Sequence, residues 1–105
     1  MAWIILTLAG LLEIVWAFAM KQSDGFTRPV PSVITLIAMI LSFGCLAWAM
    51  RSLPLGTAYA IWTGIGTLGA FLIGILVLGE GATPLRLAGA GLVLTGLALL
   101  KLSAD

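Results

Sequence analysis

The sequence predicts an all-α integral membrane protein with four transmembrane helices joined by short loops. Of its 105 residues, 62% are hydrophobic and 9% are charged, and the mean hydropathy is +1.23. Soluble domains average about 45–50% apolar and about 25% charged residues, and a small core cannot enclose this much apolar surface. The apolar residues form four runs, each long enough to cross a hydrocarbon layer about 30 Å thick as a helix. Helices are required because lipid offers no partner to unpaired backbone groups, and four strands are too few for a barrel.

The expected spans cover approximately residues 3–20, 32–50, 55–78 and 85–102. They are separated by the polar, turn-forming stretches "KQSDGFTRPVP", "RSLP" and "GEGATP". Pro31 and Pro54 end the first two connections, and Pro84 precedes the last span, where a missing N–H costs least. We therefore expect residues 1–105 to form a single four-helix transmembrane domain with both termini on one side of the membrane.

The basic residues are divided almost equally between the two sides of the membrane. The side with the termini holds Arg51 and Lys101, and the other side holds Lys21, Arg28 and Arg86. The positive-inside rule depends on an imbalance of such residues, and here the difference is one. Either another signal directs insertion, or the protein inserts in both orientations, which permits an antiparallel homodimer.

Glycines in the last two spans indicate close contacts or flexibility. Gly89 and Gly96 are seven residues apart and lie on one face of the fourth span, either for packing within the chain or as a dimer seam. Gly64 and Gly66 lie near the centre of the third span and predict a kink or hinge there.

Glu13, within "LAGLLEIVWAFAM", is the one charged residue near the middle of a span. The other charged residues lie at span ends, in links or at the terminus: Lys21, Asp24, Arg28, Arg51, Glu80, Arg86, Lys101 and Asp105. A central charge costs about 2.5 kcal/mol or more, and no span interior contains a basic residue to neutralise it. The partner of Glu13 is therefore a proton, a mobile cation, or a hydroxyl or indole group.

Burial disfavours the charged form of a carboxylic acid, and a dimer that brought two copies of Glu13 together would make them titrate jointly. Such a site exchanges protons for cations, because either one compensates the acid. Trp16 lies on the same helical face as Glu13, and Tyr59 and Trp62 are three residues apart in the third span. Aromatic faces attract cations, although each ring alone also suits packing or lipid contact. Ser42 is placed to hydrogen-bond Glu13, or alternatively the carbonyl four residues before it.

Other functional classes lack their residues. The chain has no histidine and one cysteine, Cys45, so we expect no metal site, cofactor or disulfide. A net charge of +1 gives no reason to expect nucleic acid as a partner. No nucleophile–base pair indicates an enzyme.

The chain resembles the small multidrug resistance family over nearly its whole length. "GLLEIVWAFAMKQSDGFT" and "LPLGTAYAIWTGIGTLGAF" carry the resemblance. Met39 with Ser42, together with "TAYAIWTGIG", is similar to the guanidinium-exporting subtype. The resemblance implies a multi-pass protein of the bacterial inner membrane that forms an antiparallel, dual-topology homodimer with one central site.

The resemblance also assigns roles to residues. It makes Glu13 the shared ligand of protons and substrate, with Ser42 bonded to it and Trp16, Tyr59 and Trp62 forming the walls. It implies a bend at Gly64 and Gly66 and a dimer seam at Gly89 and Gly96, and it leaves the role of Lys101 open.

The expected function is proton-coupled export of guanidinium or small substituted guanidinium cations by alternating access. The residues alone indicate a cation and proton site, and the guanidinium label comes from the resemblance. One alternative is an exporter of quaternary ammonium or other lipophilic cations. A non-transporting membrane scaffold and a passive cation channel are the others.

Overall fold

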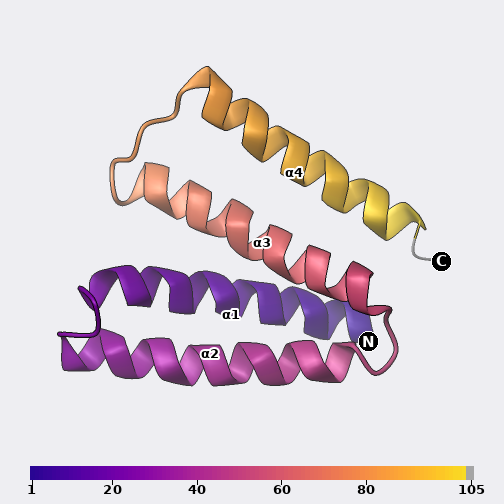
Figure 1. Cartoon of the computed structure of the whole chain (residues 1–105), viewed down its shortest axis with the longest axis horizontal. Coiled ribbons are helices and arrows are strands. Elements are labelled where there is room, and N and C mark those ends of the chain that lie inside the picture. Colours follow the sequence, from indigo (N-terminus) through magenta and orange to yellow (C-terminus); the bar gives the residue numbers. More distant parts are fainter. Residues whose placement is uncertain (104–105) are drawn as a thin grey trace.

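The computed structural model describes residues 1–103, which form four α-helices and no strand (Figure 1). They are α1 (Ala2–Gln22), α2 (Pro29–Ala49), α3 (Leu55–Leu76) and α4 (Pro84–Ser103). All four are long and apolar enough to cross a membrane. The predicted four-helix fold is confirmed, and the helix ends differ from the expected span ends by three residues or fewer, most at Pro29. Asp105, expected at the aqueous terminus, lies outside the described residues.

The helix ends follow from local chemistry. α2 and α4 begin at Pro29 and Pro84, where proline loses no helical hydrogen bond. The backbone N–H of Arg86 donates to the Thr83 hydroxyl at 3.2 Å, which caps the first turn of α4. After α1 the buried Ser23 hydroxyl donates to the Met20 carbonyl at 2.6 Å and turns the chain towards α2. The α1–α2 and α3–α4 connections lie at one end of the molecule, and the N-terminus and the last turn of α4 lie at the other (Figure 1).

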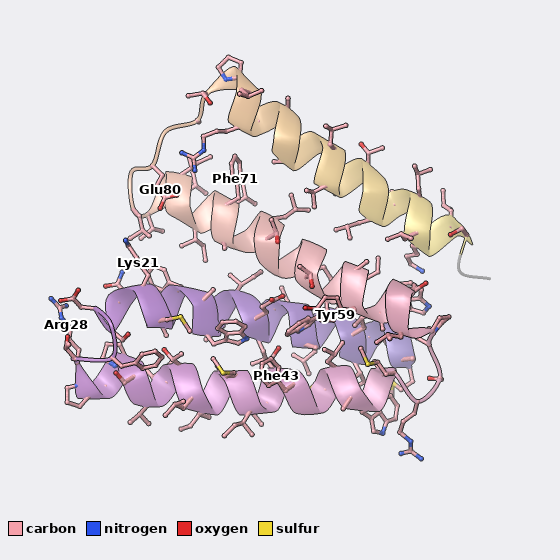
Figure 2. The ribbon with its side chains drawn as sticks, viewed as in Figure 1. Lys21, Arg28, Phe43, Tyr59, Phe71 and Glu80 are labelled. Carbon is pink, nitrogen blue, oxygen red and sulfur yellow. The ribbon has the colours of Figure 1, made fainter. Side chains whose placement is uncertain are left out.

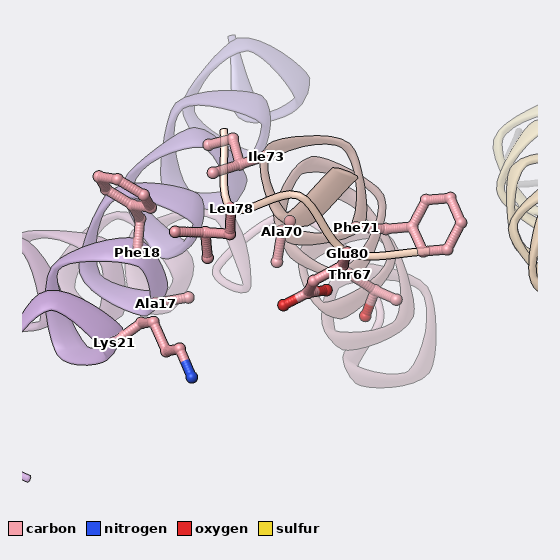
Figure 3. Close-up of a pocket in the computed structure, with 10 residues that line it drawn as sticks. Ala17, Phe18, Lys21, Thr67, Ala70, Phe71, Ile73, Leu78 and Glu80 are labelled. Carbon is pink, nitrogen blue, oxygen red and sulfur yellow. The ribbon is translucent and has the colours of Figure 1, made fainter. Parts of the chain in front are cut away.

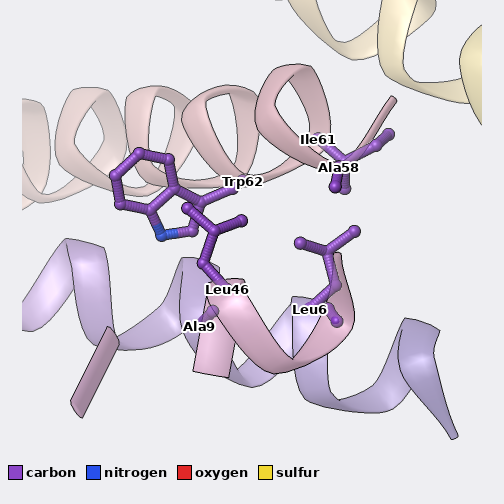
Figure 4. Packing of buried hydrophobic residues seen from close by; sticks show 7 residues of the cluster. Leu6, Ala9, Leu46, Ala58, Ile61 and Trp62 are labelled. Carbon is purple, nitrogen blue, oxygen red and sulfur yellow. The ribbon is translucent and has the colours of Figure 1, made fainter. Parts of the chain in front are cut away.

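The core lies where α1, α2 and α3 meet. It consists of small and aliphatic side chains with one indole: Leu6, Ala9, Leu46, Ala49, Ala58, Ile61 and Trp62 (Figure 4). α1 contacts both α2 and α3, so the span that carries Glu13 is the central helix of this three-helix unit.

α4 is the least covered helix. Its backbone approaches only α3, and no residue of Pro84–Ser103 is buried. A long side chain supplies a further contact, because the Lys101 Nζ lies 4.3 Å from the centre of the Trp3 ring on α1. The outer face of α4 is therefore available to lipid or to a second protein.

Candidate functional site

Glu13 lies in the middle of α1 and is directed towards α3. Its carboxyl group occupies the space beside Gly66, where a Cβ atom would overlap it. One carboxylate oxygen, Oε1, is buried without a hydrogen-bond partner. The ion pair that the structure contains within residues 1–103 joins Arg86 to Glu80 and leaves Glu13 unneutralised. Gly66 thus lets α3 approach closely enough to bury this acid, and the acid keeps a free acceptor.

The three aromatic residues expected around Glu13 are brought into one cluster, and a fourth joins them. The rings of Tyr59 and Trp62 on α3 have centroids 5.5 Å apart. Phe43 on α2 lies 5.7 Å from the Trp62 ring and 6.3 Å from the Trp16 ring on α1, both in edge-on geometry. Figure 2 labels Phe43 and Tyr59, which lie on α2 and α3. The cluster therefore extends from α1 through α2 to α3.

Sequence reasoning missed Phe43. The available signal was its position next to Ser42, in the middle of an otherwise aliphatic part of the second span. Its side chain is about half exposed, as is that of Tyr59. The cluster is thus open on one side, and an exposed aromatic face is able to meet a ligand.

Ser42 is fully buried but does not bond Glu13. Its hydroxyl donates to the Ala9 carbonyl on α1 at 2.6 Å and accepts from the Trp62 indole N–H at 3.0 Å. The expectation that Ser42 donates a hydrogen bond to Glu13 is therefore wrong, because the single hydroxyl proton of Ser42 is donated to the Ala9 carbonyl. The alternative expectation, a bond to the carbonyl four residues earlier, does not describe the contact either. Ser42 instead links α1, α2 and α3 and fixes the Trp62 ring.

Two further buried polar groups are unpaired among the described residues: the Trp16 indole N–H and the Thr63 hydroxyl. Trp16 is one turn from Glu13 on α1, so a free donor and a free acceptor lie on the same helical face. Buried polar groups are normally satisfied, so each one that is not calls for an explanation, and a functional role is one. The region around Glu13 therefore has hydrogen-bonding capacity that this single chain does not use.

The glycines divide into two groups. A Cβ on Gly64 would overlap the Leu97 side chain of α4, so Gly64 and Gly66 both allow close approach to α3. α3 is an unbroken helix from Leu55 to Leu76, and a hinge at these glycines stays a prediction. Gly89 and Gly96 have nothing within 4 Å of an added Cβ. They border open space, and the dimer seam also stays a prediction.

A cavity of ≈ 400 Å³ lies between α1 and α3 (Figure 3). It does not include Glu13, but it begins one helical turn away at Ala17 and extends to Lys21 and Glu80 at the end with the α1–α2 loop. No cluster of three metal-ligating side chains occurs in the described part of the chain. The site's chemistry thus consists of one unneutralised carboxyl group, aromatic faces and unpaired donors.

Comparison with known proteins places this arrangement in a family. The family model described as "Small Multidrug Resistance protein" matches residues 1–94. The chain is 60% identical over 103 residues to the "Guanidinium exporter" of Escherichia coli (strain K12), covering 98% of both chains. It is 59% identical over 104 residues to the "Guanidinium exporter" of Salmonella typhimurium (strain LT2), covering 99% of both. A "Guanidinium exporter" of Citrobacter freundii is 59% identical over 103 residues, or 98% of each chain.

The four apolar helices and these bacterial relatives agree on location: the chain is a multi-pass protein of the inner membrane. The family model covers nearly all of the chain, including Glu13 and the aromatic cluster. The expected resemblance is confirmed, and the chain belongs to the small multidrug resistance family.

Proposed function

We propose that the protein is a proton-coupled antiporter that exports guanidinium or small substituted guanidinium cations by alternating access. The observation that carries the proposal is the Glu13 carboxyl group, which lies at mid-span with a buried oxygen and no partner among residues 1–103. The names of the relatives, which are guanidinium exporters at 59–60% identity, supply the substrate class. The class of activity is therefore transport rather than catalysis.

The chemistry of the site supports competition between a proton and a cation. An isolated carboxylate at the membrane centre is costly, so the empty site takes a proton. A cation that reaches Glu13 supplies the same compensation and releases the proton. Guanidinium is planar and meets a carboxylate with two parallel N–H donors. The Trp62 ring, held by Ser42, and the open Tyr59 ring offer faces on which the cation is able to stack.

The working unit in this proposal is an antiparallel homodimer. α4 is uncovered, and Gly89 and Gly96 border open space that another helix is able to enter closely. The near-equal division of basic residues permits both insertion orientations. Two copies of Glu13 would then share one central site, and exchange of the two subunits' roles would expose it to each side in turn.

The principal test is uptake of labelled guanidinium into proteoliposomes with an acidic interior, so that outward proton movement drives uptake. We expect Glu13→Gln to abolish gradient-driven uptake, because an amide neither releases a proton nor neutralises the cation. Asp24→Asn is the matched control, since it makes the same chemical change in the exposed α1–α2 loop and should retain the wild-type rate. Uptake by Glu13→Gln at the wild-type rate would show that the site is assigned wrongly.

The same preparation separates the alternative functions. A saturable response to a tetraalkylammonium ion, with none to guanidinium, would replace the proposed substrate. Flux without counter-movement of protons would indicate a channel. Tryptophan fluorescence that never responds to guanidinium at any pH would favour a scaffold, because Trp16 and Trp62 lie in the aromatic cluster.

The dimer orientation has a separate test. Gln22→Cys and Ser103→Cys, each made in a Cys45→Ser background, place one thiol at opposite ends of the helices. With dual topology, a membrane-impermeant thiol reagent labels part of each variant from either side of intact membranes. Complete labelling of each variant from a single, fixed side would contradict dual topology.

A further inference from the structure

The cavity between α1 and α3 begins one helical turn from Glu13, at Ala17, and extends to the end of the molecule that carries the α1–α2 loop. Ala17, which lines it, is one turn beyond Glu13, and Thr67, which also lines it, follows the Gly66 that contacts the Glu13 carboxyl. The walls along the way are mostly apolar: Phe18, Ala70, Ile73 and Leu78 (Figure 3). The cavity therefore has the position of a vestibule on one side of the central acid.

The charged groups of this vestibule are at its outer end. The Lys21 amine and the Glu80 carboxylate line opposite sides of it (Figure 3). Glu80 is the acidic residue that lines the vestibule. Its carboxyl group lies against the backbone of α3, where a Cβ on Gly74 would overlap it. An incoming cation would meet the Glu80 carboxylate before it reached Glu13.

The chain itself places a guanidinium group on Glu80. Arg86 Nη2 lies 3.5 Å from Glu80 Oε1, and the Arg86 guanidinium carbon lies 5.7 Å from the centre of the Phe71 ring. A carboxylate beside an aromatic ring is the combination that suits a planar cation. Glu80 and Phe71, both from the end of α3 and its loop, thus hold the same chemical group that the proposed substrate carries (Figure 2).

The internal ligand is held weakly enough to be displaced. Both side chains of the pair are 44% exposed, and the nitrogen–oxygen distance between them is 3.5 Å. Ion pairs of this exposure contribute little to stability. Lys21 also lines the vestibule, but it is not paired with Glu80 in the described structure.

We propose that Glu80 is a second cation-binding group, at the mouth of the path to Glu13, where guanidinium takes the place of the Arg86 side chain. The Phe71 ring supports the exchanged cation, and the displaced Arg86 turns into the aqueous phase. The identity of the cation rests on the proposed function, whereas the site rests on Glu80, Phe71 and Arg86.

Two single substitutions give this proposal a distinctive signature in guanidinium transport. Arg86→Ala removes the internal competitor, so KM should fall about two- to five-fold, the range expected for loss of an exposed ion pair. Glu80→Gln removes the binding group, so KM should rise while the maximal rate changes less. The double variant should behave as Glu80→Gln, because the competitor has nothing left to block. Arg86→Lys retains the charge and should give an intermediate KM.

A purely structural role for the ion pair predicts a different result. Either substitution would then break the same contact, and both would change KM in the same direction. That outcome, or no change in KM with either variant, would overturn the proposal. Phe71→Leu offers a second variant if Glu80→Gln folds poorly in size-exclusion chromatography, and it too should raise KM.

Direct binding separates this site from the central one. In equilibrium dialysis with labelled guanidinium, the double variant Glu13→Gln with Arg86→Ala should retain saturable binding. Adding Glu80→Gln should abolish that binding. If the wild type fails to transport guanidinium, the proposed function falls but this result is unaffected. Equal binding with and without Glu80, in the Glu13→Gln background, would refute the second site alone.

Discussion

Gly66→Ala should disable the central site without unfolding the protein. An alanine Cβ at this position would overlap the end of the Glu13 side chain, because Glu13 Cγ lies only 2.8 Å from the position of that Cβ. Ordinary contact begins at 3.4 Å, so Cγ must withdraw by 3.4 − 2.8 = 0.6 Å, and the carboxyl atoms, which overlap more, by on the order of 1 Å. The atoms that must move are the flexible end of one side chain rather than backbone.

The energetic consequences fall on function more than on stability. An off-rotamer side chain costs about 0.5–1.5 kcal/mol, and alanine in place of a helical glycine returns up to about 1 kcal/mol. The two terms nearly cancel, and the unfolding temperature should change by a few degrees at most. A ligand group misplaced by about 1 Å, however, costs on the order of 100-fold in rate. We expect guanidinium uptake to fall by 10- to 100-fold, with weaker equilibrium binding.

Two alanine substitutions in the same helix serve as controls. Gly56→Ala meets nothing within 4 Å and should leave uptake and binding unchanged. Gly64→Ala meets Leu97 instead of Glu13, so it tests the hinge without displacing the carboxyl group. A hinge defect slows flux but leaves equilibrium binding intact. Wild-type binding by Gly66→Ala, whatever its flux, would refute the reasoning from carboxyl displacement.

Three other predictions concern the surroundings of the site. Ser42→Ala leaves the buried Trp62 indole N–H without its acceptor, so the unfolding free energy in detergent should fall by about 1–3 kcal/mol and the tryptophan emission should shift. An unchanged melting curve and emission spectrum would argue against this hydrogen bond. Lys101→Gln removes a cation–aromatic contact worth about 0.5–1 kcal/mol and should lower the unfolding free energy by that amount at the C-terminal end of α4. Trp3→Leu should give the same loss of unfolding free energy, and the double variant should lose no more; additive losses would exclude coupling between the two residues. In the proposed mechanism protons and guanidinium compete for Glu13, so acidification should weaken guanidinium binding to the wild type. Isothermal titration in two buffers should report proton release, and binding that is independent of pH would contradict the competition.

The sequence was sufficient to predict the helices because their signal is compositional. Apolar runs of transmembrane length, with proline at their borders, determine four helices however these pack. The absence of an ion-pair partner for Glu13 was predictable for the same reason. No span interior contains a basic residue, and this holds however the helices pack. Helical spacing likewise placed Trp62 next to Tyr59, whose rings lie 5.5 Å apart.

Contacts between helices were harder to predict because they depend on how each helix is rotated about its axis. Ser42 was expected to bond Glu13, but α2 presents it to the Ala9 carbonyl, one turn earlier on α1. Phe43 was not expected in the aromatic cluster, although it bridges Trp16 and Trp62. Gly66 was read as a source of flexibility, whereas the structure also gives it a steric role beside Glu13. In each case the residue type suggested a role, but the sequence did not predict which residue it would contact.

The corrected position of Ser42 bears on how the acid remains available. A hydroxyl bonded to Glu13 would partly satisfy the carboxyl group and reduce its need for a proton or a cation. Here the hydroxyl is used by Ala9 and Trp62, so the aromatic wall is fixed while Glu13 Oε1 stays unpaired among residues 1–103. Unpaired buried acceptors are costly, and that cost is relieved when a proton or cation arrives. The hydrogen bonds that order the aromatic cluster therefore leave the carboxyl group of Glu13, the proposed binding group, without a partner among the described residues.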